Sequence, residues 1–248
     1  MSIKCWICNK NDADSREHKF KASVIRDIDQ DNEGLVYFKG EVTSDLNGDN
    51  DPKIKYEKII CSHCNNKVTQ AHDKAYDEFT KSIFRLKYPY SFLNFVNFED
   101  VVNVNKIISL KKYFAKILGC EIKKYCIEND KTWVKTLNKL GNFIKDPNLK
   151  ELEDLSITIS INPSFIGINP DFLELLKMNC YWGGLGSLLV ANDLEPVEWI
   201  LSHNLNFLII NLYLTKDARL QELDFSKKRI VHGQFIIDPR FEGAVKLY

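Results

Sequence analysis

Long apolar runs are missing from this sequence of 248 residues. No stretch approaches the roughly 18 consecutive apolar residues that a membrane-spanning helix needs. The first five residues, Met1 to Cys5, also lack the apolar core of a signal peptide. We therefore expect a cytoplasmic protein with no membrane partner. Seven cysteines in that reducing compartment favour metal ligation or buried thiols over disulfides.

An excess of charge of either sign is also absent. Lys+Arg and Asp+Glu both number 34, which excludes a wholly basic nucleic-acid coat protein and a polyacidic tail protein. The charge is unevenly distributed, however: the net charge is −2 over residues 1–84, +7 over 85–150 and −5 over 151–248. We expect one domain at 1–84, rich in cysteine and histidine, and a second at 85–248 that begins with the basic segment.

Two common ligand-binding loops are not present. The acidic stretch that begins at Asp27 has Asn32 and Phe38 where an EF-hand requires glycine and glutamate. We interpret residues 27–51 as an inserted, solvated loop. The glycine-rich run 182–186 is not followed by Gly-Lys-Ser/Thr, so it favours a turn or a strand bend over a phosphate-binding loop.

Hydrophobic periodicity predicts a mixture of helices and strands. Apolar residues at steps of three and four indicate helices over residues 65–86, 103–118, 132–145 and 170–178, with Gly119 as a C-terminal stop. Stretches rich in β-branched and aromatic residues predict strands at 53–60, 156–161, 207–214 and 229–237. The fold class we expect is α+β, and no internal repeat is visible.

Four cysteines form two C-x2-C motifs, Cys5-Trp6-Ile7-Cys8 and Cys61-Ser62-His63-Cys64. Each motif is typical of a zinc knuckle, because its turn presents two thiolates to one ion, and two knuckles complete a tetrahedral site. We therefore predict structural zinc held by Cys5, Cys8, Cys61 and Cys64. The other three cysteines, at 120, 126 and 180, have no such spacing and are predicted to be buried thiols.

The residues around the knuckles resemble a known family. Glu17-His18 lies between the motifs, and Asn65 follows the second motif at the start of a predicted helix. This order resembles the HNH (His-Me finger) endonucleases, in particular their zinc-stabilised branch. The run 61–76 is similar to a motif of uncharacterised bacterial HNH proteins, and the resemblance covers about the first third of the chain. It implies a zinc-bound, treble-clef-like ββα-metal module and a role in bacterial defence or mobile-element biology.

The resemblance also implies an activity and roles for individual residues. The activity is metal-dependent hydrolysis of phosphodiester bonds in DNA, with RNA as an alternative substrate. His18 would be the general base, since histidine titrates near neutral pH. Glu17 and Asn65 would hold a catalytic Mg²⁺ or Mn²⁺ through oxygen. His72 is either a further ligand or phosphate contact, or a structural hydrogen-bonding residue.

The sequence departs from the family pattern in two places. The acidic residue is Glu17 where aspartate is more usual, which lengthens the ligand by one methylene. The middle asparagine that usually supports the loop bearing the base is missing, and the nearest asparagines are Asn47 and Asn50 in the polar stretch. The support of His18 is therefore the weakest part of the resemblance.

Basic residues suggest where nucleic acid would bind. Phosphate backbones attract clustered lysines without sequence readout, and the candidates are Lys67, Lys106, Lys111, Lys112 and Lys116. A solvated helix face is the alternative for these lysines. The second domain would bind substrate or a partner protein. The alternative function is a zinc-containing adaptor that binds nucleic acid or protein without hydrolysis, with Glu17-His18 as an exposed turn.

Overall fold

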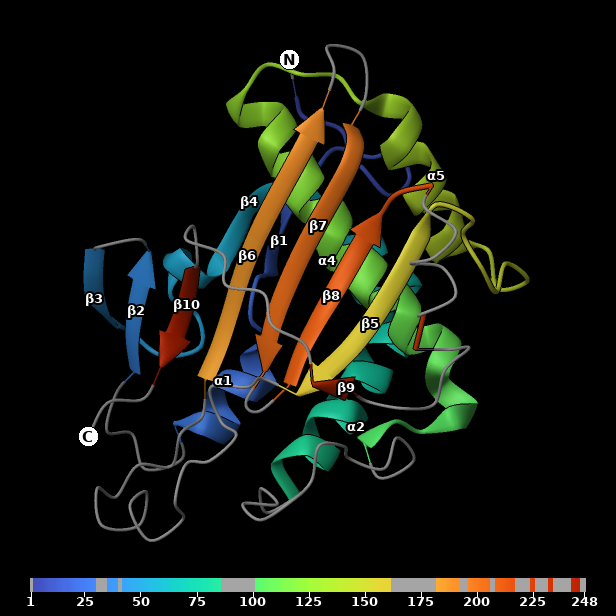
Figure 1. The fold of residues 1–248 in the computed structure, drawn as a ribbon. Coiled ribbons are helices and arrows are strands. Elements are labelled where there is room, and N and C mark those ends of the chain that lie inside the picture. The colour runs from blue at the N-terminus through green and yellow to red at the C-terminus, as the bar shows by residue number, and fades with distance from the viewer. Residues whose placement is uncertain are drawn as a thin grey trace, which may run out of the picture.

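The computed structural model describes residues 2–29, 35–39, 42–85, 101–161, 182–191, 196–205, 208–216, 224–225, 232–233 and 242–245. These residues form an α+β fold (Figure 1), as the periodicity predicted. None of the helices in these ranges is long and apolar enough to cross a membrane.

The helices and helical turns of the described ranges lie in the first 145 residues. They are α1 (Ala22–Ile28), a 3-10 turn (Pro52–Ile54), a π-helical turn (Cys64–Val68), α2 (Gln70–Arg85), a second 3-10 turn (Val104–Lys106), α4 (Ile107–Glu128) and α5 (Val134–Lys145).

The strands within the described ranges form two sheets. The small sheet pairs β1 (Ser15–His18) with β4 (Lys55–Ile60) in antiparallel fashion. The large sheet has the strand order β3-β2-β10-β6-β7-β8-β5-β9. Its members are β2 (Leu35–Lys39), β3 (Val42–Leu46), β5 (Leu155–Ile161), β6 (Trp182–Ala191), β7 (Pro196–Leu205), β8 (Leu208–Leu214), β9 (His232–Gly233) and β10 (Glu242–Val245). All of its pairings are antiparallel except the short parallel pair of β5 with β9.

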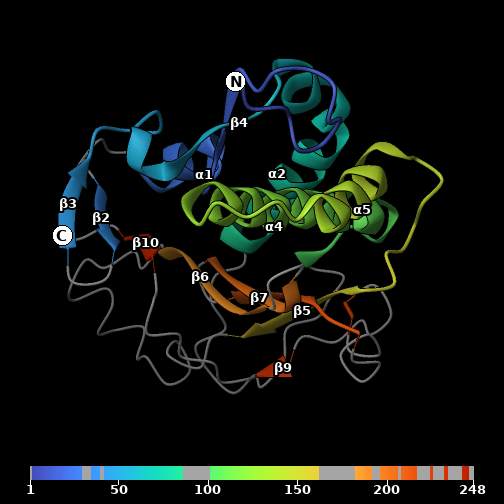
Figure 2. The same cartoon turned by 90° about the horizontal axis from the view of Figure 1, so that it is seen from above.

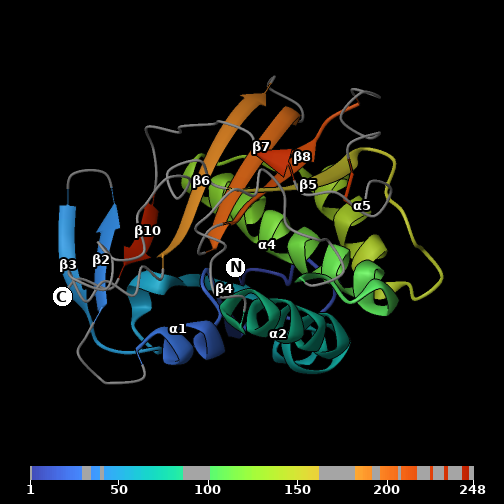
Figure 3. The ribbon, with the colours of Figure 1, turned by 60° about the horizontal axis from the view of Figure 1, so that its bottom comes forward.

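Helix α4 lies at the centre of the molecule (Figure 2). The large sheet is on one side of it, and α1, α2 and the small sheet are on the other, as Figure 3 also shows. The helix is buried around its whole circumference between residues 110 and 122. This all-round burial explains why its sequence has no clean polar face.

One hydrophobic core spans the boundary expected at residues 84 and 85. Trp6 and Phe79 from the first third of the chain belong to the same buried cluster as Phe114 of α4 and Leu212 of β8. Strands β2 and β3 from the first third of the chain also join the large sheet. The expected division into 1–84 and 85–248 therefore runs through a shared sheet and a shared core.

Most predicted elements are present, with three corrections. The stretch 27–51, interpreted as a solvated loop, contains the hairpin of β2 and β3. The glycine-rich run 182–186, interpreted as a turn or a strand bend, lies within β6 and so does not form a turn. Gly119 does not end a helix, since α4 continues to Glu128. The predicted helix at 170–178 lies outside the described residues, as does most of the predicted strand at 229–237.

Gly119 has a packing role that explains its presence in mid-helix. A Cβ atom at this position would lie 2.2 Å from the indole ring of Trp6. A Cβ atom at Gly141 of α5 would likewise lie 2.6 Å from the carbonyl oxygen of Ile7. The first knuckle thus packs directly on α4 and α5 at two positions where only hydrogen leaves enough room.

This packing predicts the effect of one added methyl group. Gly119→Ala should lower the free energy of unfolding by about 1–3 kcal/mol through overpacking, although alanine favours helix by about 1 kcal/mol. Denaturant unfolding measures the change. In a Trp6→Leu background the same substitution should cost little or stabilise the protein. An equal cost in both backgrounds would show that the indole is not the obstacle.

Candidate functional site

The four knuckle cysteines converge at one point. The sulfurs of Cys5, Cys8, Cys61 and Cys64 all lie within 4.8 Å of one another, and none of these residues forms a disulfide. The Sγ atoms of Cys8 and Cys61 are 3.9 Å apart, close to the ~3.8 Å that a tetrahedron with Zn–S bonds of about 2.3 Å requires. The cluster is therefore compatible with structural zinc.

Local hydrogen bonds shape both knuckles. The backbone amide of Asn9 donates to the carbonyl of Cys5 at 2.8 Å, and Asn9 has a left-handed φ of 52°. In the second knuckle the carboxylate of Asp14 accepts from the amide of Ser62 at 2.6 Å. These contacts hold the turns in place around the sulfurs.

The thiols of the cluster differ in acidity. Burial raises the pKa of Cys5 to about 11. Burial acts to raise the pKa of Cys8, but hydrogen bonds from the backbone amides of Asn11 and Lys10 outweigh it and lower that pKa to about 7. Burial and the neighbouring cysteines raise the pKa of Cys64. Four crowded sulfurs cannot all carry negative charge without a cation, and Zn²⁺ would supply it.

Metal analysis tests this centre. The purified chain should contain one zinc per molecule, and Cys61→Ser should lose the metal and unfold at a lower temperature, because an incomplete site no longer ties the knuckles together. Elemental analysis and thermal unfolding measure the two effects. Cys126→Ala is the matched control: its buried thiol lies outside the cluster, so zinc content should be unchanged. Full zinc in Cys61→Ser would contradict the assignment.

Glu17 lies in β1 with its carboxylate turned inward. The residue is 6% exposed, and its Oε1 atom is 3.0 Å from Nζ of Lys116 on α4. The same ammonium is 2.6 Å from Oδ1 of Asp73 on α2. We call Glu17, Lys116 and Asp73 the charge triad; it joins the small sheet, α2 and α4, and Asp73 is its partly exposed member.

Lys116 stays charged within this triad. Burial acts to lower the pKa of Lys116, but the carboxylates of Glu17 and Asp73 outweigh it and together hold that pKa above its usual value. Thr69 adds a polar contact, since its hydroxyl donates to Asp73 at 3.1 Å and accepts from Nζ of Lys116 at 3.5 Å. The lysine therefore compensates two acidic groups that burial alone would make costly.

The triad predicts a large effect of removing its centre. Lys116→Met should lower the free energy of unfolding by about 3–5 kcal/mol, because two carboxylates lose the cation that they share. Chemical denaturation measures this loss. Lys74→Met, at an exposed position of α2, is the control and should change stability by about 0.5 kcal/mol or less. Adding Glu17→Gln and Asp73→Asn to Lys116→Met should restore much of the loss; no recovery would mean that the cost is one of packing.

His18 is the last residue of β1, and its ring is held by the loop that follows β3. Nε2 lies 3.0 Å from the carbonyl oxygen of Asp49, and a carbonyl only accepts, so Nε2 carries the proton. Nδ1 is then the basic nitrogen. Burial, followed by the charge of Lys55, lowers the pKa of His18 below 6.5. The imidazole is consequently neutral at neutral pH, as a general base requires.

The loop that supports His18 is itself well braced. The buried carboxylate of Asp51 accepts from the amides of Asn47 at 2.9 Å and Lys53 at 2.8 Å, and Arg26 forms an ion pair with Asp49. A backbone carbonyl between Asn47 and Asn50 thus provides the support for the His18 ring that the sequence analysis could not locate.

Asn65 contacts β1 across the start of the helical segment. Its amide nitrogen donates to Oγ of Ser15 at 3.0 Å and to the carbonyl of Arg16 at 3.4 Å. The side-chain carbonyl accepts no hydrogen bond from the residues in the described ranges, and Asn65 is half-buried. That oxygen is chemically suited to a hard cation.

His72 has the structural contact that was one of its two sequence interpretations. It is 8% exposed, and its Nε2–H donates to the carbonyl of Ile144 at the end of α5, at 3.2 Å. Within the described ranges, the four cysteines are the only group of three or more His, Cys, Asp or Glu side chains placed to share a metal. Glu17 and His72 are not brought together in such a group.

The predicted basic face on α4 is corrected by the structure. Lys111, Lys112 and Lys116 are all no more than 3% exposed and cannot meet a phosphate backbone. Lys111 pairs with the buried Asp224 at 3.0 Å, and Lys112 donates to the carbonyl of Asp146. These lysines are internal because α4 is covered on all sides.

The other two predicted phosphate contacts lie outside α4. Lys67, in the π-helical turn, is exposed. Lys106, in the turn before α4, forms an ion pair with Glu78 of α2. Neither residue belongs to an exposed basic face on α4, since the three predicted lysines of that helix are buried.

The sequence pattern assigned Lys116 to phosphate binding and not to an ion pair with Glu17, and it did not indicate Asp73 or Asp49 as parts of this site. Asp73 and Lys116 are separated by 43 positions, and only the packing of α2 on α4 brings them together. Asp49 acts through its backbone carbonyl, which no side-chain motif records. Comparison with known proteins adds nothing further: no family model, curated protein or solved structure matches this chain.

Proposed function

We propose that this protein is a zinc-stabilised, metal-dependent endonuclease of the HNH type that hydrolyses phosphodiester bonds in DNA. The observation that carries the proposal is the arrangement around β1. His18 ends this strand with a neutral, oriented imidazole, and Asn65, next to the second knuckle, is hydrogen-bonded to the same strand. The four cysteines fasten the segments that bear these residues.

The residues would divide the chemistry between them. Nδ1 of His18 would accept the proton of the attacking water. Glu17, through the oxygen that does not face Lys116, and the Asn65 carbonyl would hold Mg²⁺ or Mn²⁺. Such an ion supplies positive charge beside the scissile phosphate and the leaving oxygen. Lys116 would fix the position of Glu17 and offset its negative charge.

Plasmid nicking tests this proposal. After EDTA treatment, the wild-type protein should cut only when Mg²⁺ or Mn²⁺ is restored, and His18→Ala should cut at least about 100-fold more slowly, which is the usual minimum contribution of a general base. His63→Ala is the matched control, because this exposed histidine lies outside the proposed site; its rate should equal that of the wild type. Equal cutting by His18→Ala and wild type would disprove the role of the base.

The pH profile gives a further readout of the same experiment. The unprotonated form of His18 is the active one, so the rate should rise with pH and level off. Because the pKa of His18 is lowered from 6.5, half of the plateau rate should be reached below pH 6.5. A rate that still climbs steeply above neutral pH would assign the titration to another group.

The second candidate is a zinc-containing adaptor that binds nucleic acid or protein without hydrolysis. The burial of Glu17 against Lys116 favours it, since a structural ion pair explains this carboxylate without a metal. Retardation of DNA in a gel by wild-type protein, without cutting under any metal condition, would support the adaptor. We propose a role in bacterial defence or mobile-element biology for the nuclease and not for the adaptor.

A further inference from the structure

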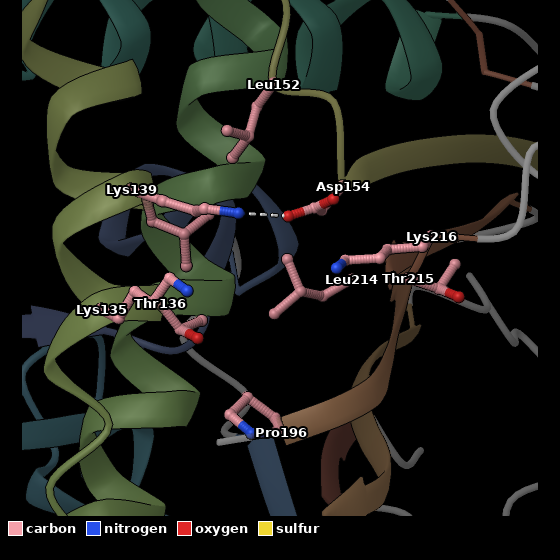
Figure 4. A pocket seen from close by; sticks show the side chains of 10 residues that line it. Lys135, Thr136, Lys139, Leu152, Asp154, Pro196, Leu214, Thr215 and Lys216 are labelled. Carbon is pink, nitrogen blue, oxygen red and sulfur yellow. Dashed lines mark hydrogen bonds and ion pairs between the residues drawn. The ribbon is translucent and has the colours of Figure 1, made fainter. Parts of the chain in front are cut away.

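A cavity separates α5 from the adjoining strands of the large sheet. Its volume is about 150 Å³. Helix α5 forms one wall, and the opposite wall comes from the beginning of β7, the end of β8 and the segment before β5 (Figure 4). The cavity contains none of the residues assigned to zinc or to the proposed nuclease site.

Three lysines place positive charge at this cavity. Lys135 and Lys139 extend from successive turns of α5, and Lys216 approaches from the end of β8 (Figure 4). The carboxylate of Asp154 is the acidic group in the lining, and it pairs with Lys139 at 2.6 Å. Lys135 and Lys216 are exposed and form no ion pair with the residues in the described ranges. Two positive charges are thus left for a ligand.

The remaining lining consists of two threonines, Thr136 and Thr215, and apolar side chains. Leu140 is fully buried behind the lining and Leu214 is 9% exposed. Leu152 and Pro196 are partly exposed and, with Leu214, form the accessible apolar surface. The amide of Thr215 donates to the carbonyl of Asp154 at 2.8 Å, which fixes the segment before β5 to the end of β8. An apolar floor with a few charged groups at its edge is typical of a small-molecule site.

We propose that this cavity binds a phosphorylated ligand with an apolar or aromatic portion, such as a nucleotide. The phosphate would contact Lys135 and Lys216, because ammonium groups bind phosphate through charge-assisted hydrogen bonds. The apolar portion would lie against Leu152, Pro196 and Leu214. The phosphate belongs either to a free nucleotide or to a nucleotide of a nucleic-acid strand. The site stands independently of whether His18 supports hydrolysis.

Calorimetric titration with AMP tests the site in the full-length protein without added divalent metal. AMP should bind, and adenosine should bind at least about tenfold more weakly, because it lacks the phosphate. The double variant Lys135→Gln, Lys216→Gln should weaken AMP binding by at least about tenfold. Both positions are exposed, so the fold should be retained. Lys145→Gln is the matched control: this exposed lysine of α5 does not line the cavity, and it should bind AMP as the wild type does.

Competition identifies the source of the phosphate. A short single-stranded oligonucleotide that displaces AMP would identify nucleic acid as the ligand, and one that leaves AMP bound would identify a free nucleotide. Displacement by inorganic phosphate supports the lysines as the anchor in either case. An absence of AMP binding, or equal AMP affinity in the double variant and the wild type, would overturn the proposal. Neither result depends on cleavage, so failure here is distinct from failure of the proposed nuclease.

Discussion

The convergence of four cysteines is the constraint on which the rest of the structure depends. Cys8 and Cys61 are 53 positions apart in sequence, yet their sulfurs lie at the spacing of a shared tetrahedral ion. Gathering them fixes the N-terminal segment against β4 and the start of α2. It also places the first knuckle on Gly119 and Gly141, so the centre positions α4 and α5 as well. The candidate site and the helical layer therefore share one support.

Buried lysines of α4 provide a second set of tertiary contacts. Lys116 faces away from the large sheet, toward Glu17 and Asp73. Lys111 pairs with Asp224, whose carboxylate also accepts from the amide of Ile157 in β5 at 2.8 Å. Buried ion pairs rarely add much net stability, but a misplaced partner leaves an uncompensated charge. The two lysines thus penalise any packing in which α4 is rotated or shifted between its two neighbours.

The parts of this fold that the sequence predicted are those set by local patterns. The C-x2-C spacing identified the cysteine cluster, and periodicity located α5, β4, β5 and β8 closely. The prediction of a basic face on α4 was wrong because the sequence of a lysine-rich helix does not reveal the acidic residues that its lysines pair with. Here those residues, Asp73 and Asp224, come from distant segments of the chain. The prediction that Gly119 ends a helix was wrong for a similar reason. A glycine that ends a helix and a glycine that makes room for an indole ring cannot be told apart in the sequence.

The burial of the α4 lysines changes where a nucleic acid could meet the protein. Lys111 and Lys116 of α4 direct their positive charges into the molecule. They pair there with the carboxylates of Glu17, Asp73 and Asp224. Exposed lysines remain on α5 and at the end of β8, around a cavity that contains no proposed catalytic residue. Since α5 also packs on the first knuckle through Gly141, a ligand held at that cavity would bind a helix that the cysteine cluster already positions. If both proposals hold, the phosphate-binding cavity and the site of hydrolysis would lie in different parts of the molecule, since no residue belongs to both.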